Sequence, residues 1–157
     1  MNAFDQAMTR QVAPILEARG FVRRGQNWSR RERGAIEVVS FQRSMYNTRR
    51  GARFTVNIGV TPDLVSSHIW VAEPECRWRK RIGALRPEAQ DHWYSYLPDD
   101  PASVQAAVTE ALDDIEAYVL PYLATASPMP LAMRIVVGIW QGVRILFGRS
   151  GGLRRRR

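Results

Sequence analysis

Two alternating runs of apolar and polar residues, at positions 36–44 and 54–60, form the most regular pattern in the chain. Both runs are rich in β-branched and aromatic residues, and the polar segment between them contains Gly51, which favours a turn. The pattern predicts an antiparallel hairpin in which Ser44 lies opposite Arg53. One face of this pair is then apolar and the other carries amides and hydroxyls, as in a half-buried sheet. The cross-strand pairs are Val39 with Ile58, Phe41 with Val56, Ser40 with Asn57, and Gln42 with Thr55.

The patterns before this hairpin predict a helix and a second, shorter hairpin. Apolar residues at helical spacing predict a helix over residues 2–19, which Pro14 kinks or divides and the following glycine ends. Residues 21–32 then predict the short hairpin, and Arg33-Gly34 turns the chain into the central pair. The order of elements therefore begins helix, hairpin, hairpin.

The patterns after the central hairpin predict one more strand and a long helix. Residues 76–85 alternate arginine with other side chains and predict a strand, whereas residues 86–98 predict a loop or a helical turn. An Asp-Asp-Pro sequence at residues 99–101 is a strong helix start, and Pro121 ends that helix. Residues 61–74 fit either a short helix or an irregular segment.

These elements predict one α+β domain. An antiparallel sheet of about five strands carries the N-terminal helix and the later helix on one face and leaves its other face partly open. The domain spans residues 1–123, followed by a linker at 124–130 and an apolar amphipathic helix with a basic tail at 131–157. A length of 157 residues and an apolar fraction of 45% suit a soluble domain with a real core.

Several motifs, in this order and spacing, resemble those of one bacterial family. They are Gly20-Phe21, Trp28, Phe41-Gln42-Arg43-Ser44, Phe54 with Val56-Asn57 and Gly59-Val60, Arg81-Ile82-Gly83, and then Asp91 and Trp93. Over residues 4–123 the chain resembles the bacterial family catalogued as domain of unknown function 4304. The resemblance implies the fold, and because the family has no established activity it implies no reaction.

The net charge of +8 arises almost entirely from the C-terminal segment. Residues 128–157 contain seven arginines and no acid, and without them 16 basic residues nearly balance 15 acidic ones. Residues 19–53 hold ten arginines against Glu32 and Glu37, whereas residues 99–116 hold six acids and no base. These two segments can neutralise each other across the fold, or the basic one can face an anionic partner.

Two groups of side chains are candidates for binding a ligand or a partner. The first is the polar face of the central hairpin, formed by Ser40, Gln42, Thr55 and Asn57. Amides there can orient a ligand, or the four side chains can satisfy one another beneath a loop. The second group consists of three arginines at alternating positions, Arg77, Arg79 and Arg81. They can hold phosphates or a carboxylate-rich partner, or they can pair with acids such as Asp113, Asp114 and Glu116.

The sequence predicts no metal, cofactor or catalytic group. Cys76, His68 and His92 are its only soft ligands, and their spacing matches no zinc pattern. Nothing marks Cys76 as an activated nucleophile, and a lone cysteine is usually a small buried hydrophobe. One cysteine permits no internal disulfide, and the N-terminus resembles no signal peptide, which together indicate the cytoplasm.

The C-terminal segment predicts an apolar helix at residues 131–147, followed by a basic tail. This helix can pack on the domain or on a second copy, or it can lie on an anionic membrane surface at the inner face of the membrane. Alternatively, the arginines alone can contact nucleic acid. The anion contacts would come from Arg134, Arg144, Arg149, Arg154, Arg155, Arg156 and Arg157.

The favoured function is a non-enzymatic binding domain for a protein partner, of the adaptor or toxin-immunity type. A nucleic-acid binder is the first alternative, in which aromatic side chains stack on bases beside the arginines. The aromatic candidates are Trp28, Trp78, Trp93, Tyr94 and Tyr96, which can instead fill the core. An enzyme with an amide-lined pocket is the second alternative.

Overall fold

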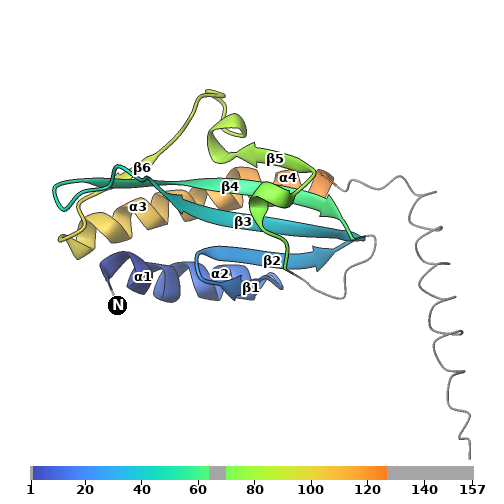
Figure 1. Cartoon of the computed structure of the whole chain (residues 1–157), viewed down its shortest axis with the longest axis horizontal. Helices are drawn as coiled ribbons and strands as arrows, with labels where there is room; N and C mark the ends of the chain where they lie inside the picture. The colour runs from blue at the N-terminus through green and yellow to red at the C-terminus, as the bar shows by residue number, and fades with distance from the viewer. Residues whose placement is uncertain (1, 64–69, 127–157) are drawn as a thin grey trace, which may run out of the picture.

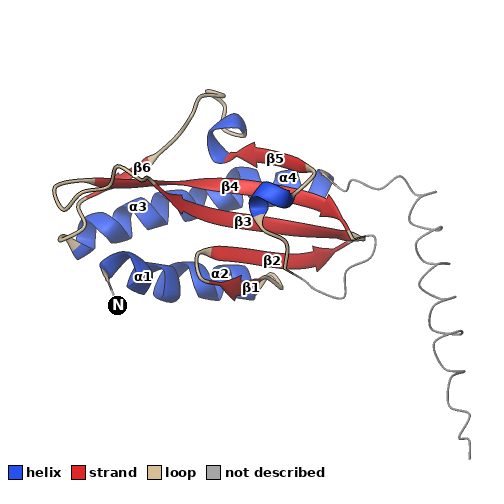
Figure 2. Ribbon diagram, viewed as in Figure 1, coloured by secondary structure: helices blue, strands red, loops and turns tan. Residues whose placement is uncertain are grey.

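A six-stranded antiparallel sheet forms one layer of the protein, and two helical segments cover one of its faces (Figures 1 and 2). The computed structural model describes residues 2–63 and 70–126. The strand order is β1-β2-β3-β4-β5, and β6 pairs with β4 beside β5. The strands are β1 (Val22–Arg24), β2 (Asn27–Glu32), β3 (Ala35–Arg43), β4 (Ala52–Pro62), β5 (Trp78–Arg81) and β6 (Tyr94–Tyr96). This arrangement confirms the predicted α+β fold.

The register of the central hairpin is the one that the sequence predicts. Ser40 lies opposite Asn57, and Gln42 lies opposite Thr55. Phe41 is 2% exposed, whereas Gln42 on the other face is exposed. The predicted turn at Arg33-Gly34 also forms, with both residues at positive φ. The side-chain alternation decides this register, because a slip by one residue would turn the apolar face outward.

Each helical segment contains one stretch of π-helix that ends two residues before a proline. The first segment consists of α1 (Ala3–Ala7), η1 (Met8–Val12) and α2 (Ala13–Glu17), and the second of α3 (Pro101–Asp114), η4 (Ile115–Val119) and α4 (Leu120–Thr125). A proline lacks the amide hydrogen, and its ring collides with the carbonyl four residues earlier. A wider π turn at that point lets the helix continue. The prediction that Pro121 ends the later helix is therefore wrong, and Pro14 does not divide the first.

The core lies between the sheet and these helices. An aromatic group at one end joins Phe4 of α1, Phe54 of β4, and both tyrosines of β6, with ring centroids 5.1–6.1 Å apart. Trp28, Tyr94 and Tyr96 are at most 4% exposed, so they cannot stack on bases. Of the aromatic candidates, only Trp78 and Trp93 keep partly exposed rings.

A buried ion cluster lies on the helix-facing side of β3. Glu37 is 2% exposed, and its carboxylate lies 2.7 Å from Nε of Arg30 and 3.5 Å from Nη2 of Arg33. Arg33 also donates to the carbonyl oxygens of Leu123, at 2.7 Å, and of Ala124. The β2–β3 turn is thereby tied to the end of α4, where the carbonyls lack helical partners.

The opposite face of the sheet is only partly covered. The segment containing η2 (Glu73–Glu75) crosses it and buries Cys76 against Ile36 and Val38. Gly59 makes this possible, because a Cβ there would lie 2.5 Å from the Cys76 sulfur. The Cys76 thiol therefore approaches the backbone of β4 closely at this glycine. The rest of this face carries the exposed Gln42 and half-buried Ser40.

The region after β4 differs most from the sequence prediction. The predicted strand over residues 76–85 is confined to β5, and η3 (Ile82–Ala84) follows it directly. A loop then leads to β6, a strand of three residues within the segment predicted as a loop or helical turn.

Within the described residues, no helix has the length and apolar character needed to cross a membrane.

Candidate binding surface

The open face of the sheet holds a polar network built around Asn57. The Asn57 amide nitrogen donates to Gln42 Oε1 at 2.7 Å, and its oxygen accepts from Nε of Arg81 at 3.2 Å. Thr55 is fully buried and donates to the carbonyl oxygen of His92 at 2.8 Å. Ser40 lies beside Asn57 in the register. The structure thus brings the predicted hairpin residues together, and Thr55 serves to hold the loop before β6.

The three predicted arginines do not act as one stripe. Arg79 makes a two-pronged pair with buried Glu73, at 2.7 and 3.3 Å. Arg81 pairs with Asp91 at 2.9 Å, and Arg77 lies over the ring of Trp78. Asp113, Asp114 and Glu116 are not their partners; among the described residues, Asp114 binds Arg86 and Glu116 binds Arg19. The partners of Arg79 and Arg81 are thus acids from the segments before and after β5, and not those of α3 and η4.

Trp93 extends this network toward the end of the sheet. Its indole nitrogen donates to Asp91 at 2.8 Å, and its ring has Arg53 at 4.8 Å and Arg81 at 5.4 Å from the centroid. Hydrogen bonds from Arg81 and then Trp93 hold the pKa of the Asp91 carboxyl below its usual range. The Asp91 carboxylate therefore faces the guanidinium groups of Arg81 and Arg53, so the surface around Trp93 keeps a net positive charge.

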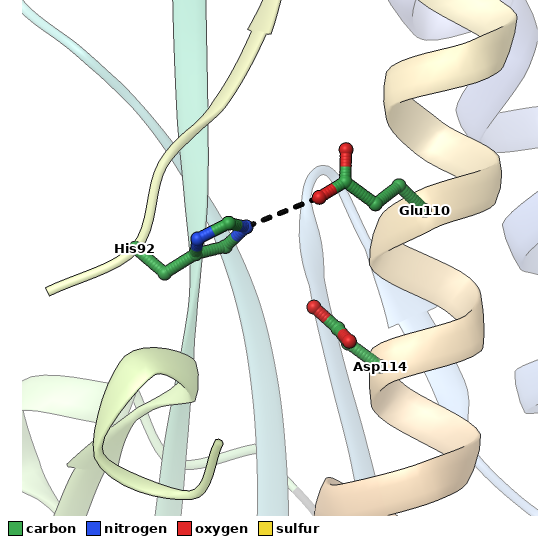
Figure 3. Close-up of side chains that lie close together, drawn as sticks. All are labelled: His92, Glu110 and Asp114. Atoms are coloured by element: carbon green, nitrogen blue, oxygen red, sulfur yellow. Dashed lines mark ion pairs between the residues drawn. The ribbon is translucent and has the colours of Figure 1, made fainter. Parts of the chain in front are cut away.

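A second polar cluster lies between the loop before β6 and helix α3. Side chains of His92, Glu110 and Asp114 point toward one another, with their ligand atoms within 4.8 Å (Figure 3). A metal ion can be held by such a set of groups. Here Nη1 of Arg86 already lies 2.5 Å from Asp114, 3.1 Å from His92 Nε2 and 3.9 Å from Glu110. A metal ion would have to displace this guanidinium, so we assign the cluster a structural role.

The same cluster anchors β6 to α3. The Tyr94 hydroxyl donates to Asp114 at 2.6 Å, and burial together with this bond raises the pKa of Tyr94 well above its ordinary value. Nε2 of His92 lies 3.3 Å from Glu110, so this nitrogen donates to the carboxylate or accepts from Arg86, depending on its proton. The loop between β5 and β6 is thus fixed at both ends.

Cys76 has the properties of a packed residue and not of a nucleophile. It is 6% exposed, and burial, followed by the charge of Glu73, raises the pKa of its thiol to about 11. A nucleophilic cysteine needs a lowered pKa and access to substrate. The prediction of a small buried hydrophobe agrees with this environment.

A hollow lies at the other end of the sheet, beside the turn of the central hairpin. Its volume is about 470 Å³, and its walls include Tyr46, Ala52, Arg53, Tyr96, Leu97 and Ser103. These residues come from residues 43–53, which we call the hairpin tip, from β6 and the residue that follows it, and from the start of α3. Figure 1 shows these segments meeting at the end of the molecule away from α4.

Large exposed apolar side chains lie at this hollow and next to it: Tyr46 and Leu97 line it, and Met45 precedes Tyr46 in the chain. Met45 is 86% exposed, Tyr46 77% and Leu97 51%. The backbone beneath them is well fixed: Asn47 bonds both the amide and the carbonyl of Arg53, and Ser103 accepts from the amide of Leu97 at 2.9 Å. The exposed side chains therefore project from an ordered frame.

The hairpin tip also carries arginines without acidic partners. Arg43, Arg49, Arg50 and Arg53 lie within these eleven residues, which contain no acid. None of the four forms an ion pair within the described part of the chain, whereas Arg19, Arg30, Arg31 and Arg33 all do. Four of the six arginines from Arg19 to Arg33 thus pair with acids, whereas none of the four at the hairpin tip does so within the described residues.

Sequence reasoning identified neither the hollow nor the exposed tip. Met45 and Tyr46 lie in the predicted loop, and the signal that was available there is two large apolar residues in a turn that otherwise favours small polar ones. The predicted anion contacts at residues 131–157 lie outside the described residues, as does His68.

Comparison with known proteins gives a family and no function. The model of the family described as "Domain of unknown function (DUF4304)" matches residues 12–125, which include the whole sheet. A search of curated proteins found no match, and a search of solved structures found none either.

Proposed function

The chain belongs to the DUF4304 family, and we propose that it is a non-enzymatic domain that binds a protein partner through the hairpin tip. The observation that carries this proposal is the exposure of Tyr46 and Leu97 in the walls of a hollow of about 470 Å³, with Met45 exposed next to Tyr46 in the chain. Methionine, tyrosine and arginine are enriched in protein interfaces, where aromatic and arginine anchors supply most of the binding energy. An adaptor or a toxin-immunity protein would present such a surface.

The polar groups on the open face support binding rather than catalysis. Asn57, Arg81 and Asp91 satisfy one another, and the thiol of Cys76 is buried. The cluster around Arg86 is likewise internally paired. A general acid or base needs a group free to reach a substrate, and these groups are committed to structural contacts.

The proposal is tested by photo-crosslinking in cells that make the protein. A photoreactive residue at position 46 should give one discrete protein adduct, and the same residue at exposed position 117 of η4, at the far end of the helical layer, should give none. Met45→Ser should abolish the adduct, whereas Val22→Ser, which alters an exposed apolar residue on β1, should leave it unchanged. Equal adducts from positions 46 and 117, or none from either, would refute the proposal. The cytoplasmic location and the membrane contact through residues 131–157 stay predictions.

A further inference from the structure

The hairpin tip gathers four arginines that form no ion pair within the described residues. Arg49 and Arg50 are exposed at the turn, and Arg43 and Arg53 flank them on β3 and β4. Arg53 has the Asp91 carboxylate nearby, whereas within the described residues no carboxylate pairs with Arg49 or Arg50, which water and counterions screen in the free protein. An anionic partner would replace these counterions.

The four arginines point to more than one side of the tip. Arg43 belongs to the helix-facing side, with its guanidinium carbon 5.5 Å from the ring centre of Phe4. Arg53 belongs to the open face, beside Trp93. Arg53 also lines the hollow, so a basic group lies directly next to the exposed apolar side chains. A ligand seated in the hollow would meet apolar and cationic groups together.

Acids lie in the chain between Leu97 and Ser103, two residues that line the hollow. Asp99 and Asp100 are exposed in the loop between β6 and α3, and Asp100 caps α3 by accepting from the amide of Ala102 at 2.9 Å. A continuous phosphate backbone crossing the hollow would pass these carboxylates at a cost. A peptide can place its acidic residues on the arginine side and its apolar residues in the hollow.

We propose that the hairpin tip recognises an acidic segment of the partner protein, with an apolar side chain of that segment seated in the hollow and its carboxylates on Arg49, Arg50 and Arg53. This inference rests on the proposed function and names the chemistry of the partner. Arginine suits this role because its planar fork binds carboxylates through two hydrogen bonds. Such an interface associates quickly at low salt and slows as salt screens the charges.

The experiment uses the full chain and three labelled synthetic peptides of about twelve residues, the length of a short recognition segment. Each contains the same leucine and phenylalanine, and the remaining positions are acidic, neutral or basic. Fluorescence anisotropy should show saturable binding of the acidic peptide alone. Its affinity should fall at least about tenfold between about 0.05 and 0.3 M salt.

Charge reversal locates the site. Arg49→Glu with Arg50→Glu should weaken binding of the acidic peptide at least about tenfold, because two attractive charges become repulsive. The matched control is Arg10→Glu with Arg24→Glu, which changes the net charge equally. Both arginines are exposed, on η1 and β1, and form no ion pair within the described residues. This control should alter the affinity less than about twofold. Circular dichroism of each variant establishes that it is folded.

The outcomes separate this inference from the proposed function. If position 46 still crosslinks to a protein, but the acidic peptide does not bind and reversal of Arg49 and Arg50 leaves the adduct intact, the acidic chemistry is wrong and partner binding stands. If a single-stranded oligonucleotide binds more tightly than the acidic peptide and loses affinity in the same variant, the surface is a nucleic-acid site and both fail. Equal effects of the two charge-reversal pairs would also overturn the inference.

Discussion

Replacement of Gly83 by alanine tests how the loop that carries Asp91 and Trp93 is held against the sheet. A Cβ at position 83 would lie 1.9 Å from the carbonyl oxygen of Gln90 and 2.7 Å from the amide nitrogen of His92. Both obstacles are backbone atoms, so rotation of a side chain relieves nothing and the loop has to move. Overpacking costs about 1–3 kcal/mol, and a backbone obstacle puts this substitution near the upper end, at about 3 kcal/mol.

The movement should also disturb the open-face network. The hydrogen bond from Trp93 to Asp91 and the bond from Thr55 to the carbonyl of His92, both 2.8 Å long, depend on the position of this loop. Loss of the second would leave the Thr55 hydroxyl buried without a partner, which adds about 1–3 kcal/mol where no water replaces it. The total destabilisation is therefore about 4–6 kcal/mol.

Urea unfolding followed by tryptophan fluorescence measures the change in the free energy of unfolding. The matched control is Gly51→Ala, because nothing lies within 4 Å of a Cβ there and its φ is not positive, so it should change this free energy by less than about 0.5 kcal/mol. The indole N–H signal of Trp93 should shift in the Gly83 variant and stay in place in the control. Equal stabilities of the two variants would refute the reasoning.

Three further predictions concern the core and the buried polar groups. Phe41→Ala should lower the free energy of unfolding by about 3–5 kcal/mol, and Gln42→Ala on the open face by less than about 1 kcal/mol, in matched urea melts. Comparable losses would mean that the open face is covered. The thiol of Cys76 should resist alkylation near neutral pH in the folded chain. Its protonated form stabilises the fold below the ordinary pKa of 9.0, and this contribution should vanish as the pH rises through about 11. Urea unfolding at a series of pH values measures this change. Glu37→Ala leaves the guanidinium groups of Arg30 and Arg33 without their carboxylate and should lower the free energy of unfolding by about 3–5 kcal/mol. Glu32→Ala, at an exposed site, should lower it by less than about 0.5 kcal/mol. Similar values for the two variants would show that the ion cluster is solvated.

The sequence by itself determined the α+β class, the two hairpins and the register of the central one. These features follow from local patterns, because the two faces of a strand alternate and a turn residue marks each reversal. Residues opposite each other in β3 and β4, such as Phe41 and Val56, are read directly from that alternation. The start of α3 was equally local, since Asp100 caps the helix with its own side chain.

Local rules gave wrong answers where the tertiary structure offset their cost. Pro121 lacks an amide hydrogen and should end a helix, yet packing of Val119 and Leu123 in the core keeps α4 attached through a π turn. The three residues of β6 carry too little pattern to predict a strand. Pairing with β4 and the bond from Tyr94 to Asp114 specify that strand instead.

Only the tertiary structure decided which charges are paired and which surface is free. The arginines of the first half look alike in the sequence, but folding places Arg30 against Glu37 and leaves Arg49 and Arg50 without a carboxylate within the described residues. The hollow beside the hairpin tip joins Tyr46 to Leu97 and Ser103, more than fifty residues apart along the chain. Ion pairs and cavities depend on distances between segments that are remote in sequence, and the periodicity of one segment holds no information about those distances.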